Sequence, residues 1–197
     1  MRKFIFLPLI LCLGCSAKPL NMDNTGRTIV AFGDSLTYGT GAELQESFPA
    51  LLGKMLNMPV INLGVPGDTA RAGANRKEQI SRHNPYMVLI EFGGNDAMRG
   101  RPFAETKAAI EEIIDYVQSL GAIAVVVDTG GNFKMSPYTK MMKQLAKDKK
   151  AFFVPAIMEG IFYKTHLKAD SVHPNAAGYK LIAEKVYKKI KHLLPPQ

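Results

Sequence analysis

The stretch IVAFGDSLTYG, residues 29–39, runs from four apolar residues directly into Gly33-Asp34-Ser35-Leu36. The apolar part is typical of a buried strand, and the residues from Ser35 onward can begin a helix. A serine at such a junction has two interpretations. It either caps the helix with its hydroxyl or presents that hydroxyl to a substrate, and the rest of the sequence decides between them.

More apolar runs follow along the chain: PVINL (59–63), YMVLIEF (86–92), AIAVVV (122–127) and AFFVP (151–155). These runs are unbroken rather than alternating, which indicates strands covered on both faces. Between them apolar residues recur at helical spacing, most clearly between positions 110 and 120. The alternation of strands and helices predicts an α/β domain, a three-layer α/β/α sandwich around a five-stranded parallel sheet.

A chain of 197 residues is long enough for one sizeable core and short for two, so we expect one domain, over residues 28–197. Residues 1–14 hold a basic start and the apolar run FIFLPLILCL, which is too short for a permanent bilayer-spanning helix. They resemble a bacterial lipoprotein signal peptide, in which Gly14 precedes the lipidated Cys15. Simple secretion is the alternative. We expect residues 15–27 to form a polar tether and the protein to be exported to the periplasm or cell envelope.

The chain is basic, with 25 Lys and Arg against 17 Asp and Glu, a net charge of +8. The excess gathers in two segments of helical pattern: Lys140, Lys143, Lys147, Lys149, Lys150, Lys185, Lys188, Lys189 and Lys191. These residues form either an ordinary solvated face or a surface with weak attraction for anionic lipid headgroups. No nucleic-acid-binding motif accompanies them, so we expect no nucleic acid partner.

Four polar stretches follow strands or precede the last helix: GDSL (33–36), GVPGDT (64–69), FGGND (92–96) and DSVHPN (170–175). Ligands of parallel sheets bind at the carboxyl ends of the strands, where we expect these stretches to gather. Each has a structural interpretation by itself, as a helix cap, a turn or a local hydrogen bond. Together they supply what acyl transfer needs: a hydroxyl, an imidazole, a carboxylate and donors for an oxyanion.

The order GDSL, PGDT, GGND and DSVHP resembles that of the SGNH (GDSL) hydrolase family, from about Ile29 to the C-terminus. The stretch GGNDAMRG, residues 93–100, is similar to the bacterial periplasmic thioesterase, lysophospholipase and arylesterase branch. The resemblance implies the flavodoxin-like SGNH hydrolase fold. It also implies a serine esterase that hydrolyses carboxylic esters or thioesters through an acyl-enzyme.

By that resemblance, Ser35 is the nucleophile, His173 the general base and Asp170 the partner of its imidazole. The oxyanion hole is formed by the backbone N–H groups of Ser35 and Gly67 and by the side-chain amide of Asn95. A glycine permits close approach of the backbone to the substrate oxygen, and a carboxamide donates N–H without adding charge. Ser35 is therefore interpreted as a nucleophile rather than a cap.

The sequence leaves two roles open for the residues that could bind the acyl group. Phe133, Met135 and Tyr138 either line an apolar pocket or hold their loop against the core. Two other functions remain open, a carbohydrate O-acetylesterase on the same scaffold and a non-catalytic binding lipoprotein. No metal-binding motif or phosphate-binding loop is present, so we expect no metal and no cofactor. We expect a monomer acting on small acyl esters or thioesters.

Overall fold

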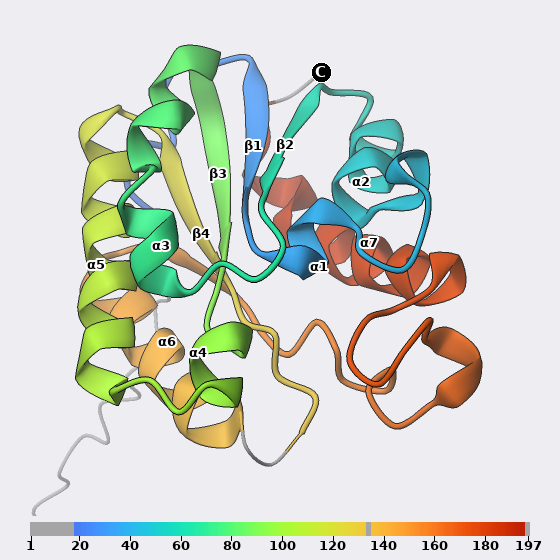
Figure 1. Ribbon diagram of the computed structural model, residues 1–197. Helices are drawn as coiled ribbons and strands as arrows, with labels where there is room; N and C mark the ends of the chain where they lie inside the picture. Colours follow the sequence, from blue (N-terminus) through green and yellow to red (C-terminus); the bar gives the residue numbers. More distant parts are fainter. Residues whose placement is uncertain (1–17, 133–134, 196–197) are drawn as a thin grey trace, which may run out of the picture.

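The computed structural model describes residues 18–132 and 135–195. Its centre is a five-stranded parallel sheet with the strand order β2-β1-β3-β4-β5 (Figure 1). The strands are β1 (Thr28–Gly33), β2 (Val60–Gly64), β3 (Pro85–Glu91), β4 (Ile123–Val127) and β5 (Phe152–Val154). All five coincide with the apolar runs of the sequence, and the predicted parallel sheet is confirmed.

Helices cover both faces of this sheet. One layer holds α2 (Phe48–Leu56) and α7 (Ala176–Ile190), and the other holds α3 (Ala70–Ala74), α5 (Phe103–Ser119) and α6 (Ser136–Asp148) (Figure 1). Two short helices, α1 (Ser35–Tyr38) and α4 (Gly94–Met98), begin close after β1 and β3. Short 3₁₀ helices lie at Leu44–Glu46, Lys77–His83, Thr165–Leu167 and Lys191–Leu193. The three-layer α/β/α sandwich is therefore confirmed.

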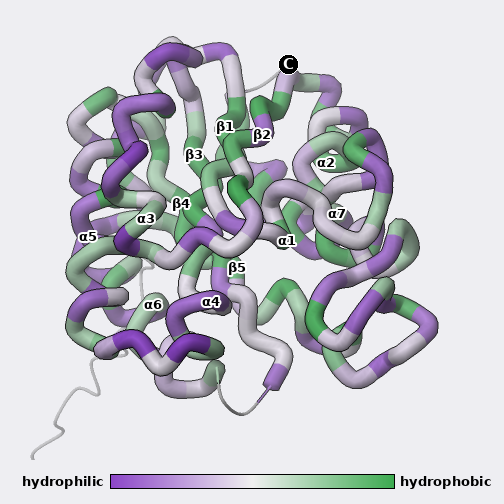
Figure 2. Tube along the Cα trace, viewed as in Figure 1, coloured by the Kyte–Doolittle hydropathy of each residue, from purple (hydrophilic) through white to green (hydrophobic). Residues whose placement is uncertain are grey.

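The core lies on both sides of the sheet, which explains why the strands are unbroken apolar runs. In β1, Ile29 and Ala31 pack into the cluster under α2 and α7, whereas Val30 and Phe32 pack into the cluster under α3, α5 and α6. All four side chains are fully buried. The strands are accordingly hydrophobic while much of the outer helical surface is hydrophilic (Figure 2). Alternate residues of one strand thus stabilise two different layers.

The segment expected to be a tether is held against the domain where the structure describes it, over residues 18–27. The N–H of Leu20 donates to the Lys150 carbonyl at 3.1 Å. The side-chain amide of Asn24 donates to the Tyr86 carbonyl at 3.1 Å. Polar side chains of this segment pair with backbone groups of the domain. Residues 18–27 are therefore not a free linker despite their polarity. No helix in the described ranges is long and apolar enough to cross a membrane.

The ends of β1 and β2 are joined by one side chain, Arg76. Its guanidinium donates to the Gly33 carbonyl and to the Leu63 carbonyl, both at 2.9 Å, and to the Asp68 carboxylate at 2.7 Å. The same group lies over the Phe32 ring, 4.3 Å from its centroid. Arg76 therefore holds together the strand ends from which two of the sequence motifs leave.

We predict that Arg76→Met lowers the free energy of unfolding by about 3 to 5 kcal/mol, because it removes the cation of the Asp68 carboxylate and a donor to two carbonyls in a poorly hydrated place. Arg71→Met is the matched control. Both arginines pair with a carboxylate at 2.7 Å, but the exposed fractions of the paired side chains are 14% and 16% for Arg76–Asp68 against 38% and 41% for Arg71–Glu112. The control should cost less than about 1 kcal/mol. Urea unfolding measures both, and equal losses would contradict the role given to Arg76.

Candidate active site

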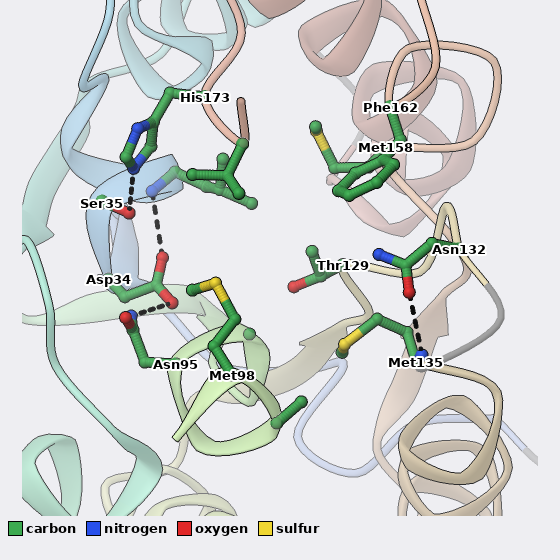
Figure 3. Close-up of a pocket in the computed structure, with 14 residues that line it drawn as sticks. Asp34, Ser35, Asn95, Met98, Thr129, Asn132, Met135, Met158, Phe162 and His173 are labelled. Carbon is green, nitrogen blue, oxygen red and sulfur yellow. Dashed lines mark hydrogen bonds between the residues drawn. The ribbon is translucent and has the colours of Figure 1, made fainter. Parts of the chain in front are cut away.

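Ser35 is the first residue of α1, directly beyond the carboxyl end of β1. The cap of this helix is Asp34, whose Oδ1 accepts a hydrogen bond from the N–H of Leu36 at 3.0 Å. The hydroxyl of Ser35 is thus not used for capping. It lies 3.0 Å from Nε2 of His173 (Figure 3).

The loop before α7 carries His173 and Asp170 together. Nδ1 of His173 lies 2.7 Å from Oδ2 of Asp170, and Oδ1 of Asp170 accepts the N–H groups of Val172 and His173, each at 2.8 Å. The loop is closed at its base by the N–H of Ala169, which donates to the His173 carbonyl at 3.0 Å. One carboxylate therefore folds the loop and orients the imidazole, and the pairing fixes the Nδ1 proton on the Asp170 side.

The charge of Asp170 is held by these contacts. Partial burial acts to raise the pKa of its carboxyl, but the hydrogen bonds from the His173 ring and from the two backbone N–H groups outweigh that effect and lower the pKa to about 2. Asp170 is consequently ionised at any pH at which the imidazole changes its charge. It can stabilise an imidazolium without becoming protonated itself.

Gly41 makes room for this loop. Its φ of +99° lies in the region that favours glycine, and a Cβ there would lie 2.5 Å from the Pro174 carbonyl oxygen and 3.4 Å from Cβ of His173. Any larger residue would push the histidine loop away from the chain that follows α1. Gly41 therefore sets the approach of His173 to Ser35, a role that its sequence context does not reveal.

Asn95 and Gly67 follow the carboxyl ends of β3 and β2, and Asn95 lines the same cavity as Ser35. The Asn95 amide, at the start of α4, donates to Oδ2 of Asp34 at 2.9 Å and to the Asp68 carbonyl at 3.0 Å. Gly67, in the loop after β2, has φ of +85°, and its N–H has no acceptor among the residues that the structure describes. The structure brings these two groups together through Asp68, although Gly67 does not line the cavity described below.

A buried pair of carboxyl groups lies under the serine. Glu91, at the end of β3, accepts the hydroxyls of Thr37 at 2.9 Å and Thr129 at 3.1 Å. Burial raises the pKa of Asp34 well above its usual range, and the Glu91 charge raises it further. Burial also raises the pKa of Glu91, against the effect of its hydrogen bonds from the two threonines. A buried carboxylate beside another is costly to ionise, so this environment favours the protonated form of each group more than water does.

A cavity of about 330 Å³ opens beside Ser35 and His173 (Figure 3). Its walls include the apolar side chains Leu36, Ala97, Met98, Met135, Met158, Phe162 and Val172. Polar groups line it as well: Asp34, Ser35, Asn95, Thr129, Asn132 and His173. A hollow with mainly apolar walls and a few polar groups, among them the serine and the histidine, is suited to an acyl or aryl group whose ester bond lies over the serine.

Of the residues expected to bind the acyl group, Met135 lines this cavity. Tyr138 does not; its ring packs edge-to-face on Phe103 with the centroids 5.4 Å apart. Phe133 lies outside the described residues. Sequence reasoning missed Met158 and Phe162, which come from the long segment between β5 and α7, where no regular pattern marks them.

Over residues 18–132 and 135–195, no three or more His, Cys, Asp or Glu side chains gather as a group that could hold a metal ion.

Comparison with known proteins agrees with this geometry. The chain is 28% identical over 177 residues to thioesterase 1/protease 1/lysophospholipase L1 of Escherichia coli K12, covering 85% of each chain. It is 27% identical over 206 residues to an arylesterase of Vibrio mimicus, covering 98% of this chain and all of the relative. The psychrotrophic esterase EstA of Pseudoalteromonas sp., in a structure inhibited by monoethylphosphonate, superposes with a TM-score of 0.77 at 26% identity, over 84% of this chain and 97% of that one.

The sequence model of the GDSL-like lipase/acylhydrolase family matches residues 31–181, which include all four polar stretches. The resemblance seen in the sequence is thereby confirmed, and the chain belongs to the GDSL-like lipase/acylhydrolase family of serine hydrolases.

Proposed function

We propose that this hydrolase cleaves carboxylic esters or thioesters that carry an apolar acyl group, with Ser35 as the nucleophile. The observation that carries the proposal is the continuous contact from Asp170 through His173 to Ser35, ending at a cavity with apolar walls. The esterase and thioesterase relatives support the same reaction class.

The reaction follows from the positions of these groups. Oγ of Ser35 attacks the carbonyl carbon while Nε2 of His173 takes its proton, and Asp170 stabilises the resulting imidazolium. Collapse of the tetrahedral intermediate breaks the ester or thioester bond, and the leaving alcohol or thiol takes the proton from His173. A water molecule deprotonated by His173 then attacks the acyl-enzyme, which releases the carboxylic acid and restores Ser35.

The oxyanion is proposed to bind to the backbone N–H groups of Ser35 and Gly67 and to the Asn95 amide. Both hydrogens of that amide already have acceptors, Asp34 and Asp68. Binding an oxyanion therefore exchanges the hydrogen bond to the neutral Asp68 carbonyl for one to a full negative charge. Such a bond is stronger because its acceptor is ionised, so the exchange favours the transition state over the ground state.

The roles of Ser35 and Asn95 can be separated with an organophosphonate probe, which reacts covalently with an activated serine. Asn95→Ala should lower kcat by about 10² to 10³ with little change in KM, and should still be labelled, because the oxyanion donor is lost while the nucleophile and its base remain. Ser35→Ala should show no labelling and no turnover above background. A wild-type kcat for Asn95→Ala would refute the oxyanion role, and active-site labelling of Ser35→Ala would refute the mechanism.

The pH dependence of kcat/KM should show a single acid limb, rising with pH as one imidazole loses its proton. Asp170 adds no second limb between about pH 4 and 8, because its pKa of about 2 leaves it ionised throughout. Asp170→Asn should lower the plateau by about 10³ to 10⁴. Full activity in this variant would show that Asp170 does not act on the imidazole.

The apolar cavity predicts a preference for longer acyl chains in a series of nitrophenyl esters. Each methylene that enters the cavity should raise kcat/KM roughly four-fold, the equivalent of about 0.8 kcal/mol of burial. Met98→Ala should reduce that increment and leave the acetyl ester near its wild-type rate, because Met98 lines the cavity but is 62% exposed and contributes little to the core. Activity confined to the acetyl ester would instead indicate an O-acetylesterase.

We also propose that the protein is exported and anchored to a bacterial membrane through a lipid on Cys15. The apolar run at residues 4–13 and the Gly14-Cys15 pair support this. These residues lie outside the described part of the chain.

A further inference from the structure

A second hollow lies away from the active site, between α6 and the edge strand β5. It has a volume of about 630 Å³, and its lining includes Pro19 and the strand residues Phe152 and Phe153. Its rim is formed by four exposed lysines, which we call the lysine face: Lys140, Lys143, Lys147 and Lys150. Three of them share one side of α6 because they are three or four residues apart.

The lysine face carries uncompensated charge. Within residues 18–132 and 135–195, none of its four lysines forms an ion pair, whereas the neighbouring Lys149 pairs with Glu111 at 2.8 Å and Asp115 at 2.9 Å. Asp148, the acidic residue at the end of α6, instead accepts a hydrogen bond from Gln144 at 2.7 Å. A cluster of unpaired lysines around an apolar hollow fits an anionic, partly apolar surface.

The start of the described chain lies at the same place. Pro19 lines the hollow, and the next residue, Leu20, is fixed by its hydrogen bond to the Lys150 carbonyl. Cys15 precedes Pro19 by four residues in the sequence. Four residues span at most about 14 Å even when fully extended. Whatever holds Cys15 at a membrane therefore keeps Pro19, which lines the hollow beside the lysine face, within about 14 Å of Cys15.

We propose that the lysine face lies on the anionic headgroups of the membrane that holds Cys15. The inference rests on the anchoring proposed above and adds the orientation of the domain. With the chain tethered so closely, the lysines meet the lipids at high effective concentration, so a weak attraction is enough.

The orientation bears on access to substrate. Residues of α6 line the hollow with the lysine face. Met135, directly before that helix, lines the catalytic cavity. α6 has 13 residues, a length of about 20 Å. A domain resting on α6 thus has its catalytic cavity within one helix length of the headgroups, where acyl lipids are found.

Sedimentation with lipid vesicles tests the proposal. The full chain is compared on phosphatidylcholine vesicles and on vesicles that also contain phosphatidylglycerol. In one variant Lys140, Lys143 and Lys147 are changed to Gln. The matched control changes Lys180, Lys188 and Lys189 to Gln, which removes the same charge. These three lysines are exposed on α7, in the opposite helical layer.

The wild type and the control should bind the anionic vesicles more tightly than the neutral ones. The lysine-face variant should lose most of this difference, on the order of 100-fold for three lysines. Raising the salt concentration to about 0.5 M should abolish the difference, because it screens the charges. All variants should hydrolyse a soluble nitrophenyl ester at the wild-type rate. The proposal would be overturned if both triple variants lost the same affinity for anionic vesicles. It would also be overturned if the wild type bound neutral and anionic vesicles equally.

Cys15→Ser separates this inference from the anchor. If the lipid holds the protein, this variant should leave the cell-envelope fraction for the soluble one. A variant that stays in the envelope would refute the lipid on Cys15. The vesicle comparison of the two triple variants does not depend on that lipid and still decides the role of the lysine face.

Discussion

The guanidinium of Arg76 is the interaction on which the catalytic end of the sheet depends. The turn from β1 into Ser35 and the loop from β2 through Gly67 start on adjacent strands. The Gly33 carbonyl at the end of β1 accepts the N–H of Val65 at 3.0 Å and also the Arg76 guanidinium, which reaches the Leu63 carbonyl of β2 as well. A planar group with donors in fixed directions can reach both carbonyls and a carboxylate at once. The ammonium of a lysine has no such geometry. The relative position of the two loops is thus set by one side chain packed on the Phe32 ring.

A second constraint is the polar network buried under the serine. Asp34 caps α1 and accepts from Asn95, while Glu91 accepts from Thr37 and Thr129, so one network joins three strand ends. Burying two carboxyl groups is costly unless their lone pairs are satisfied, and here the hydrogen bonds that they accept satisfy them. What is gained is rigidity at the point where the serine, the asparagine and the base must meet.

The sequence predicts the fold and most of the chemistry of the site. Unbroken apolar runs identify all five strands, and the helical spacing that ends near Gly121 identifies α5, because both patterns come from burial of the local segment. Ser35, Asn95, Asp170 and His173 stand in short motifs and can be found without a structure. The residues that depend on distant partners cannot. Arg76 and Glu91 have ordinary surroundings in the sequence, and only the fold shows what they contact.

The same limit explains the outcome for the cavity walls and the tether. For Tyr138 the sequence left two roles open, and its contact with Phe103 and absence from the cavity lining favour packing over acyl binding. Phe162 comes from an irregular segment that is fixed by backbone hydrogen bonds to residues distant in sequence, such as that from Met158 to Thr129. The polarity of residues 18–27 is typical of a polar tether. In the structure, amides such as that of Asn24 satisfy backbone carbonyls of the domain.

The methionines of the catalytic cavity carry a chemical consequence of their own. Met98, Met135 and Met158 bring three thioethers to the lining of the cavity, and Met98 is largely open to solvent. Thioethers suit acyl chains of varied shape because they are flexible and polarisable. Oxidants convert them to sulfoxides, which are polar and chiral. Outside the cytoplasm, oxidative damage would therefore reach this enzyme first as a loss of affinity for long acyl chains, while the serine and its base stay intact.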